Sequence, residues 1–369
     1  MKRLIILLVN RGFVPVTLLA IFLYSSEYHD EQITSELSFV VAFGQIISNF
    51  DGGVLGYLIN SEKKGIWFSL LKRYVFGILK KKIIICCCLT SALYFLDTEY
   101  IKLPWMVVFF SSLLIAVNLV MMEVAKKDDR GYVILYFCSA IITYIILFLM
   151  AVNPFIMLVI LLLNMFLVAS ISLPLSRDLL DEGGFSSFQF AQILSSVLIN
   201  KEYVLIHIIG NSMQASEFSI IGRLFVIPIQ VCSVYTLKIW VDIRRDSENI
   251  FITVFLRQML TLIFIYSVSL AAMILVSSQL QKIESVDFNS LFSVLILVNL
   301  MFVISGLFFS YVSKNLLFVS ARLSISLVLI ASGLSVLAFL LNGLQYSLFV
   351  TALVLFVLIF RNARVLKWK

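Results

Sequence analysis

The stretch PFIMLVILLLNMFLVASISLPL, residues 154–175, carries no charged side chain. It is long enough to cross the hydrocarbon core of a bilayer, which takes about 20 helical residues. Similar apolar runs recur along the 369 residues, of which 61% are hydrophobic and 13% charged, with a mean hydropathy of +1.05. A soluble domain carries about 25% charged residues. The sequence therefore predicts an all-α, polytopic membrane protein with no soluble domain.

The apolar runs predict about twelve transmembrane helices joined by short polar connections. The expected spans are 4–24, 37–59, 77–96, 103–124, 132–151, 154–175, 190–212, 218–240, 251–277, 288–312, 316–341 and 344–361. Cytoplasmic loops are enriched in Lys and Arg. With both termini in the cytoplasm, only Lys102 and Lys282 fall on the outer face, and the other Lys and Arg residues lie inside or within spans. The net charge of +7 then reflects this topology and not nucleic-acid binding.

An internal repeat is visible in the sequence. The segment NRGF at residues 10–13 recurs as NKEY at 200–203, and SEY at 26–28 recurs as SEF at 216–218, both at the same offset. This offset superimposes the first span on the seventh. We expect two parallel six-helix lobes, residues 1–187 and 188–369, an arrangement that transporters use with the substrate path between the halves.

Cations inside predicted spans need a reason, because an ionisable group at mid-bilayer costs about 2.5–3.5 kcal/mol. Arg11 and Lys201 occupy the same place in the two repeats, each 15 residues before the outer Ser26 or Ser216. At about 1.5 Å per residue, both would lie roughly 20 Å below the outer surface. They are candidates to hold an anionic group in a central cavity. The alternative is that each neutralises a carboxylate or reaches the inner headgroups.

Two carboxylates lie at comparable depths. Asp51 is placed to pair with Arg11, and Glu202 is the corresponding residue beside Lys201, although neighbours on a helix point about 100° apart. We interpret both as structural charge pairs, and ion coupling is the alternative. Arg223 is expected near the outer end of its span, where it would contact either an emerging polar substrate or a loop acid such as Glu217.

Other polar residues in the spans have simpler interpretations. His207 is expected to be a packing residue, and Arg257 is expected to reach the inner headgroups through its long side chain. The five cysteines lack metal-ligand spacing and are expected to pack as small apolar residues. The sequence contains no GxxxxGK[ST], HExxH or GxSxG motif. We therefore expect no enzyme activity, metal or cofactor.

Three segments resemble the O-antigen (repeat-unit) flippases of the polysaccharide exporter superfamily. They are NRGFVPVTLLAIFLYSSEY at 10–28, QIISNFDGGVLGYLI at 45–59 and NKEYVLIHIIGNSMQASEFSIIGRLF at 200–225. The resemblance implies twelve spans in two lobes. It also implies transport of undecaprenyl-diphosphate-linked oligosaccharide across the bacterial inner membrane, for lipopolysaccharide and polysaccharide biosynthesis, and other polysaccharide-assembly membrane proteins as possible partners. Arg11, Lys201 and Arg223 would hold the diphosphate or acidic sugars.

Two alternatives remain open. A cation-coupled multidrug exporter of the same superfamily would favour an acidic or aromatic cavity, whereas the candidate charges here are mainly basic. A membrane-embedded polysaccharide polymerase would need a large outer loop, and the longest outer connection expected here, 25–36, is short. An acyltransferase would pair an early Arg with an intramembrane His, and the nearest histidine, His29, is expected in that outer loop.

Overall fold

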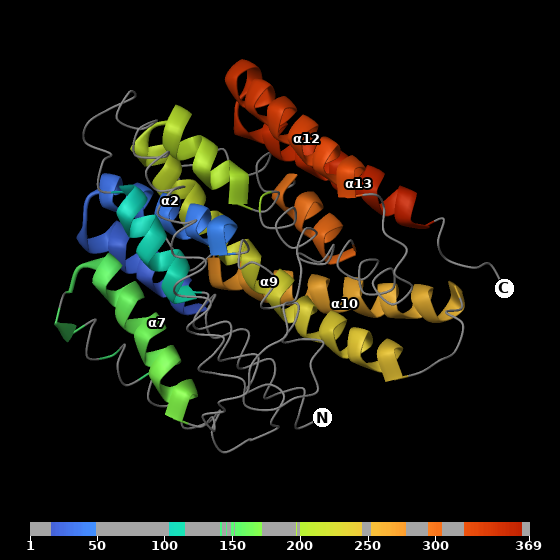
Figure 1. The fold of residues 1–369 in the computed structure, drawn as a ribbon, viewed down its shortest axis with the longest axis horizontal. Coiled ribbons are helices and arrows are strands. Elements are labelled where there is room, and N and C mark those ends of the chain that lie inside the picture. Colours follow the sequence, from blue (N-terminus) through green and yellow to red (C-terminus); the bar gives the residue numbers. More distant parts are fainter. Residues whose placement is uncertain are drawn as a thin grey trace. The chain divides into compact units, whose positions relative to one another are not determined.

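The computed structural model describes residues 16–48, 103–114, 152–171, 200–245, 252–277, 294–304 and 321–363, with a few single residues between 141 and 197. Secondary structure in these ranges is helical, and they contain no strand. The all-α prediction is therefore confirmed for the part of the chain that the structure describes. Figure 1 shows these helices along the chain.

The helices fall close to the expected spans. They are Val16–Tyr28, α2 (Glu31–Ser48), Leu103–Leu114, α7 (Pro154–Ile171), residues 200–209, α9 (Ser212–Arg245), α10 (Ile252–Ser277), Val294–Ile304, α12 (Ala321–Asn342) and α13 (Leu344–Ala363).

Local sequence signals explain several helix ends. Pro154 opens α7 at the position where its missing N–H is harmless, and the Asn153 side chain accepts a hydrogen bond of 2.9 Å from the Phe155 N–H. Asn211 caps α9 in the same way, because its Oδ1 accepts a 2.7 Å bond from the Gln214 N–H. Gly343 separates α12 from α13 with a φ of 88°, and its N–H donates to the Phe339 carbonyl at 3.0 Å. A left-handed glycine is the usual end of a helix, so α12 and α13 form a tight hairpin.

The predicted connections at 25–36 and 213–217 are wrong. The first helix continues to Tyr28 and α2 begins at Glu31, so only two residues separate them. In the second place the break falls at Gly210 and Asn211, and α9 begins at Ser212. Polar and acidic residues mark these turns in the sequence, but they also cap and favour the first turn of a helix. The chain is therefore helical throughout 213–217, and it is helical over 25–36 except at residues 29 and 30.

The observed helix ends change the predicted equivalence of the two copies of the repeat. Ser26 lies in the last turn of the helix Val16–Tyr28, before the break, whereas Ser216 lies in the second turn of α9, after the break. The two matched sites therefore do not occupy equivalent places. Lys201 lies about 12 Å of helix before the end at Ile209, not the 20 Å that the repeat suggested.

The chain divides into two compact units. One contains Met1–Leu23 and Ile209–Lys369, and the other contains Tyr24–Ile208. The boundary between the predicted lobes, 187/188, lies outside the described residues, so the lobes stay a prediction. Within the first unit, α9 packs against α10 and α12 packs against α13.

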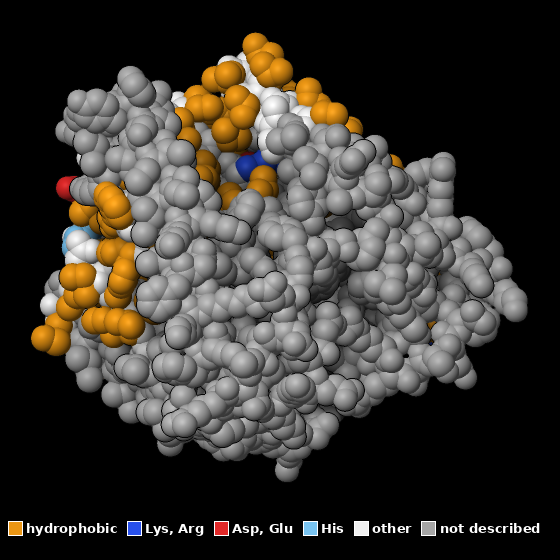
Figure 2. Space-filling view, viewed as in Figure 1, with side chains coloured by type: hydrophobic (Ala, Val, Ile, Leu, Met, Phe, Trp, Pro, Cys, Tyr) orange, Lys and Arg blue, Asp and Glu red, His pale blue; other side chains and the backbone are white. Residues whose placement is uncertain are grey.

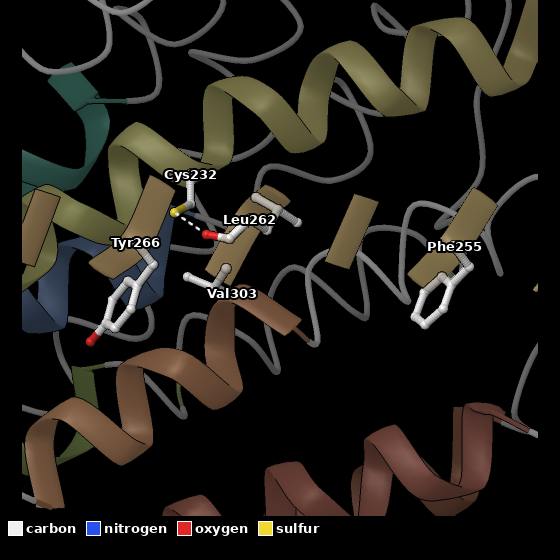
Figure 3. Packing of buried hydrophobic residues seen from close by; sticks show 5 residues of the cluster. All are labelled: Cys232, Phe255, Leu262, Tyr266 and Val303. Atoms are coloured by element: carbon white, nitrogen blue, oxygen red, sulfur yellow. Dashed lines mark hydrogen bonds between the residues drawn. The ribbon is translucent and has the colours of Figure 1, made fainter. Parts of the chain in front are cut away.

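One hydrophobic cluster joins three helices of the first unit (Figure 3). Its buried members are Cys232 from α9, Phe255, Leu262 and Tyr266 from α10, and Val303 from Val294–Ile304. The Cys232 thiol lies 3.8 Å from the Leu262 carbonyl oxygen, to which it donates, and the Tyr266 hydroxyl donates to the Ile296 carbonyl at 3.2 Å. Cys232 is therefore a packing residue, as its sequence context predicted.

Apolar side chains also cover much of the outer surface of the described residues (Figure 2). Within the described residues, Val254–Leu275 of α10 is the helix that is both long and apolar enough to cross a membrane, with a mean hydropathy of 2.0 over 22 residues. The core helix of a soluble protein passes the same test but is mostly buried, whereas only 17% of the apolar window here is buried. The twelve-span count stays a prediction.

Candidate functional site

Two of the five candidate site residues lie outside the described residues. These are Arg11 and Asp51, so their expected pairing and the contribution of Arg11 to a cationic cavity stay predictions. Lys201, Glu202 and Arg223 are described. The first two belong to the unit Tyr24–Ile208, and Arg223 belongs to the other unit.

Lys201 and Glu202 form a buried ion pair in the helical segment 200–209. The Lys201 ammonium donates to a Glu202 carboxylate oxygen, and the two residues are only 6% and 2% exposed. Neighbouring positions on a helix do not face each other, and we expected the two side chains to diverge. The long, flexible lysine stem overcomes this separation. A buried charge is expensive unless it is paired, so the charge-pair interpretation of Glu202 agrees with this geometry.

The same helix is tied to α2 by a histidine. Ser35 Oγ and His207 Nδ1 share a hydrogen bond of 2.8 Å, and the Phe39 ring centroid lies 4.7 Å from that of His207. A buried polar group needs such a partner, since leaving it unsatisfied costs about 1–3 kcal/mol. His207 therefore packs against α2 with a hydrogen bond at Nδ1, which agrees with its interpretation as a packing residue.

The polar face of α2 was missed from the sequence. Thr34, Ser35 and Ser38 are all buried, and Thr34 Oγ1 lies 2.8 Å from Ser25 Oγ, which ties α2 to the preceding helix. The hydropathy pattern predicts a loop at residues 25–36. The spacing of three and four residues between these hydroxyls matches one face of a helix, and that spacing was the available signal.

Arg223 lies deeper in its helix than the sequence suggested. Because α9 begins at Ser212, Arg223 is about 16 Å along the helix and not near its end. It is only 4% exposed. Its guanidinium carbon lies 5.4 Å from the centroid of the Phe22 ring. A cation over an aromatic face at this distance is attracted by the ring quadrupole.

An apolar cluster lies close to Phe22 and Arg223 in the sequence of both helices. Leu19 of Val16–Tyr28 packs with Leu224 and Ile227 of α9, and Met273 of α10 packs against the same cluster. The arrangement holds a permanent cation inside an apolar contact between helices. Such a group can bind a phosphate or carboxylate through the planar fork of its N–H donors. Among the described residues, no group of three His, Cys, Asp or Glu side chains is placed to hold a metal ion.

Comparison of the chain with protein-family models, with curated proteins and with solved structures gives no match.

Proposed function

We propose that the chain is a flippase of the bacterial inner membrane with twelve spans in two lobes. It moves undecaprenyl-diphosphate-linked oligosaccharide from the inner to the outer leaflet by alternating access. The proposal rests on the sequence resemblance and on two structural features, an apolar outer surface and a cation buried between helices. The observation that carries it is Arg223, which lies about 16 Å inside α9 and is almost completely buried.

The exposed apolar surface supports a membrane environment. Leu260 and Phe264 lie one helical turn apart on α10 and are 63% and 69% exposed, and Leu275 is 70% exposed. Large apolar side chains also face outward on α12 and α13, among them Leu341 and Phe349. A soluble monomer rarely exposes large contiguous apolar patches, whereas the hydrocarbon core of a bilayer would solvate them.

Arg223 supports an anionic cargo. An arginine remains charged at any physiological pH, and a permanent cation deep inside a membrane helix marks a functional site by default. In our proposal Arg223 binds the diphosphate or an acidic sugar, and the polyprenyl tail stays among the lipids. Arg11 and Lys201 are the further cations that we propose for the same anionic cargo.

Lys201 must be released from Glu202 before it can bind the cargo, because its ammonium group is already paired with that carboxylate. In the proposed cycle, Lys201 binds the cargo only while Glu202 is neutralised by a proton or another cation. Asp51 would control Arg11 in the same manner. In this cycle Glu202 and Asp51 are ion-coupling groups. If they are fixed charge partners instead, Lys201 and Arg11 stay paired and do not bind the cargo.

The function is tested by complementation of a strain that lacks its repeat-unit flippase, with lipid-linked glycan measured at the cell surface. The intact chain should restore surface glycan, and Arg223→Gln should abolish it. Arg257→Gln is the matched control, since Arg257 is an exposed arginine on α10 and should tolerate the change. Membrane expression of each variant is measured by immunoblot.

The outcomes separate the claims. No surface glycan from the intact chain across several repeat-unit backgrounds would contradict the function. Equal activity of both arginine variants at equal expression would keep the function and remove Arg223 from the site.

A further inference from the structure

Phe22 occupies a defined place beside the candidate cation. It lies in the helix Val16–Tyr28, three residues after Leu19, which packs against α9. Phe22 is 0% exposed, and its ring centroid lies 5.4 Å from the guanidinium carbon of Arg223. Both residues belong to the same compact unit. Phe22 is not among the candidate site residues predicted from the sequence.

The Arg223 guanidinium can bind an aromatic ring and a phosphate through different parts of the group. A guanidinium is a flat group with its N–H donors in the plane, and it binds phosphate in bidentate fashion through that edge. An aromatic ring attracts the cation through its negative face, and the attraction is larger when the pair is desolvated. An aromatic contact of this kind restricts the guanidinium without using its bidentate edge.

Fixing the donor in advance matters for binding. An arginine side chain has several rotatable bonds, and immobilising such a side chain when a ligand binds weakens the affinity. A side chain that is already held avoids that loss. We propose that Phe22 is a positioning residue for Arg223, which holds the guanidinium in the orientation that binds the diphosphate of the cargo. This inference rests on the proposed function, because it requires Arg223 to bind an anionic cargo.

The test separates ring electrostatics from apolar packing. Phe22 is replaced in the full-length protein by mono-, di- and trifluorophenylalanine, which progressively weaken the negative face of the ring and change its shape little. Affinity for undecaprenyl diphosphate in detergent micelles is measured by the ligand-induced shift in melting temperature. The control is the same series at Phe110, an equally buried phenylalanine whose close contact is with Gly44.

We expect the Kd to rise stepwise at Phe22, reaching about tenfold for the trifluoro variant, which lies between the sizes expected for an exposed and for a fully desolvated cation–π contact. The Phe110 series should bind like the unmodified protein. Phe22→Tyr, which keeps the aromatic face, should bind within about threefold of it, and Phe22→Leu should bind about tenfold more weakly.

Three results would overturn the inference. A Kd that stays flat across the Phe22 series while Phe22→Leu weakens binding would assign Phe22 to apolar packing only. Equal gradients at Phe22 and Phe110 would show a general effect of fluorination. If the unmodified protein binds no diphosphate lipid, the proposed function fails first and takes the positioning role of Phe22 with it, and that result is distinct from a flat series.

Discussion

The buried pair of Lys201 and Glu202 gives the sharpest stability prediction. Each residue is less than 10% exposed, and the ammonium donates directly to the carboxylate. Removing one partner leaves an uncompensated buried charge, which costs about 3–5 kcal/mol, whereas replacing both by apolar residues of similar volume is often neutral. We therefore expect Lys201→Met and Glu202→Leu each to lower the free energy of unfolding by about 3–5 kcal/mol. The double variant should recover most of that loss.

The assay is reversible unfolding of the four proteins in mixed micelles, combined as a double-mutant cycle. Such a cycle isolates the energy of the pair from other effects of each substitution. A surface pair would show little coupling, because exposed ion pairs are worth about 0–1 kcal/mol. Two single substitutions that each cost less than about 1 kcal/mol and add without coupling would refute the argument that the pair is buried and mutually dependent.

Two further predictions concern α2 and use matched controls. Gly44→Ala should be about 1–3 kcal/mol less stable than Gly333→Ala in the same unfolding assay, because an added Cβ at Gly44 would overlap the buried Phe110 ring while the one at Gly333 meets nothing within 4 Å. Equal stability of these two variants would mean that the helices around Gly44 are not closely packed. Ser35→Ala should cost about 1–3 kcal/mol, because it leaves His207 Nδ1 buried without its partner, and a simultaneous His207→Leu should remove most of that cost if the hydrogen bond is its origin.

The positions of the helices were largely predictable from hydropathy. The expected spans that begin at 154 and 344 match the first residues of α7 and α13, and the expected span 251–277 matches α10 within one residue. Each of these ends has a strong local signal, such as Pro154 at the start of α7 and Gly343 before α13.

The ends near acidic and polar residues were less predictable. Only two residues separate one helix from the next at Asp30 and at Asn211. The polar segments that hydropathy predicts as loops are therefore mainly helical. The error then affected the site, because the depth of Lys201 and of Arg223 was measured from the wrong helix end. Hydropathy indicates which side chains prefer water or lipid. It does not indicate the residue at which the backbone hydrogen bonds of a helix end.

The contacts of the candidate site depended on tertiary packing. Nothing in the sequence links Ser35 to His207, or Phe22 to Arg223, because each pair is far apart in the chain and comes together only when helices pack. The pairing of Lys201 with its neighbour was missed for a local reason. Helical geometry separates adjacent side chains by about 100°, but the lysine stem is long enough to bridge that separation.

The central claim is that this chain moves a lipid-linked glycan across a bilayer. The most direct measurement is translocation of undecaprenyl-diphosphate-linked oligosaccharide in proteoliposomes, followed by the access of an added lectin to the glycan on the opposite leaflet. We expect the intact protein to expose the glycan faster than protein-free liposomes, and the Arg223→Gln protein to match the protein-free rate. A protein that inserts into the liposomes but leaves the rate at the protein-free value for every glycan tested would contradict the claim.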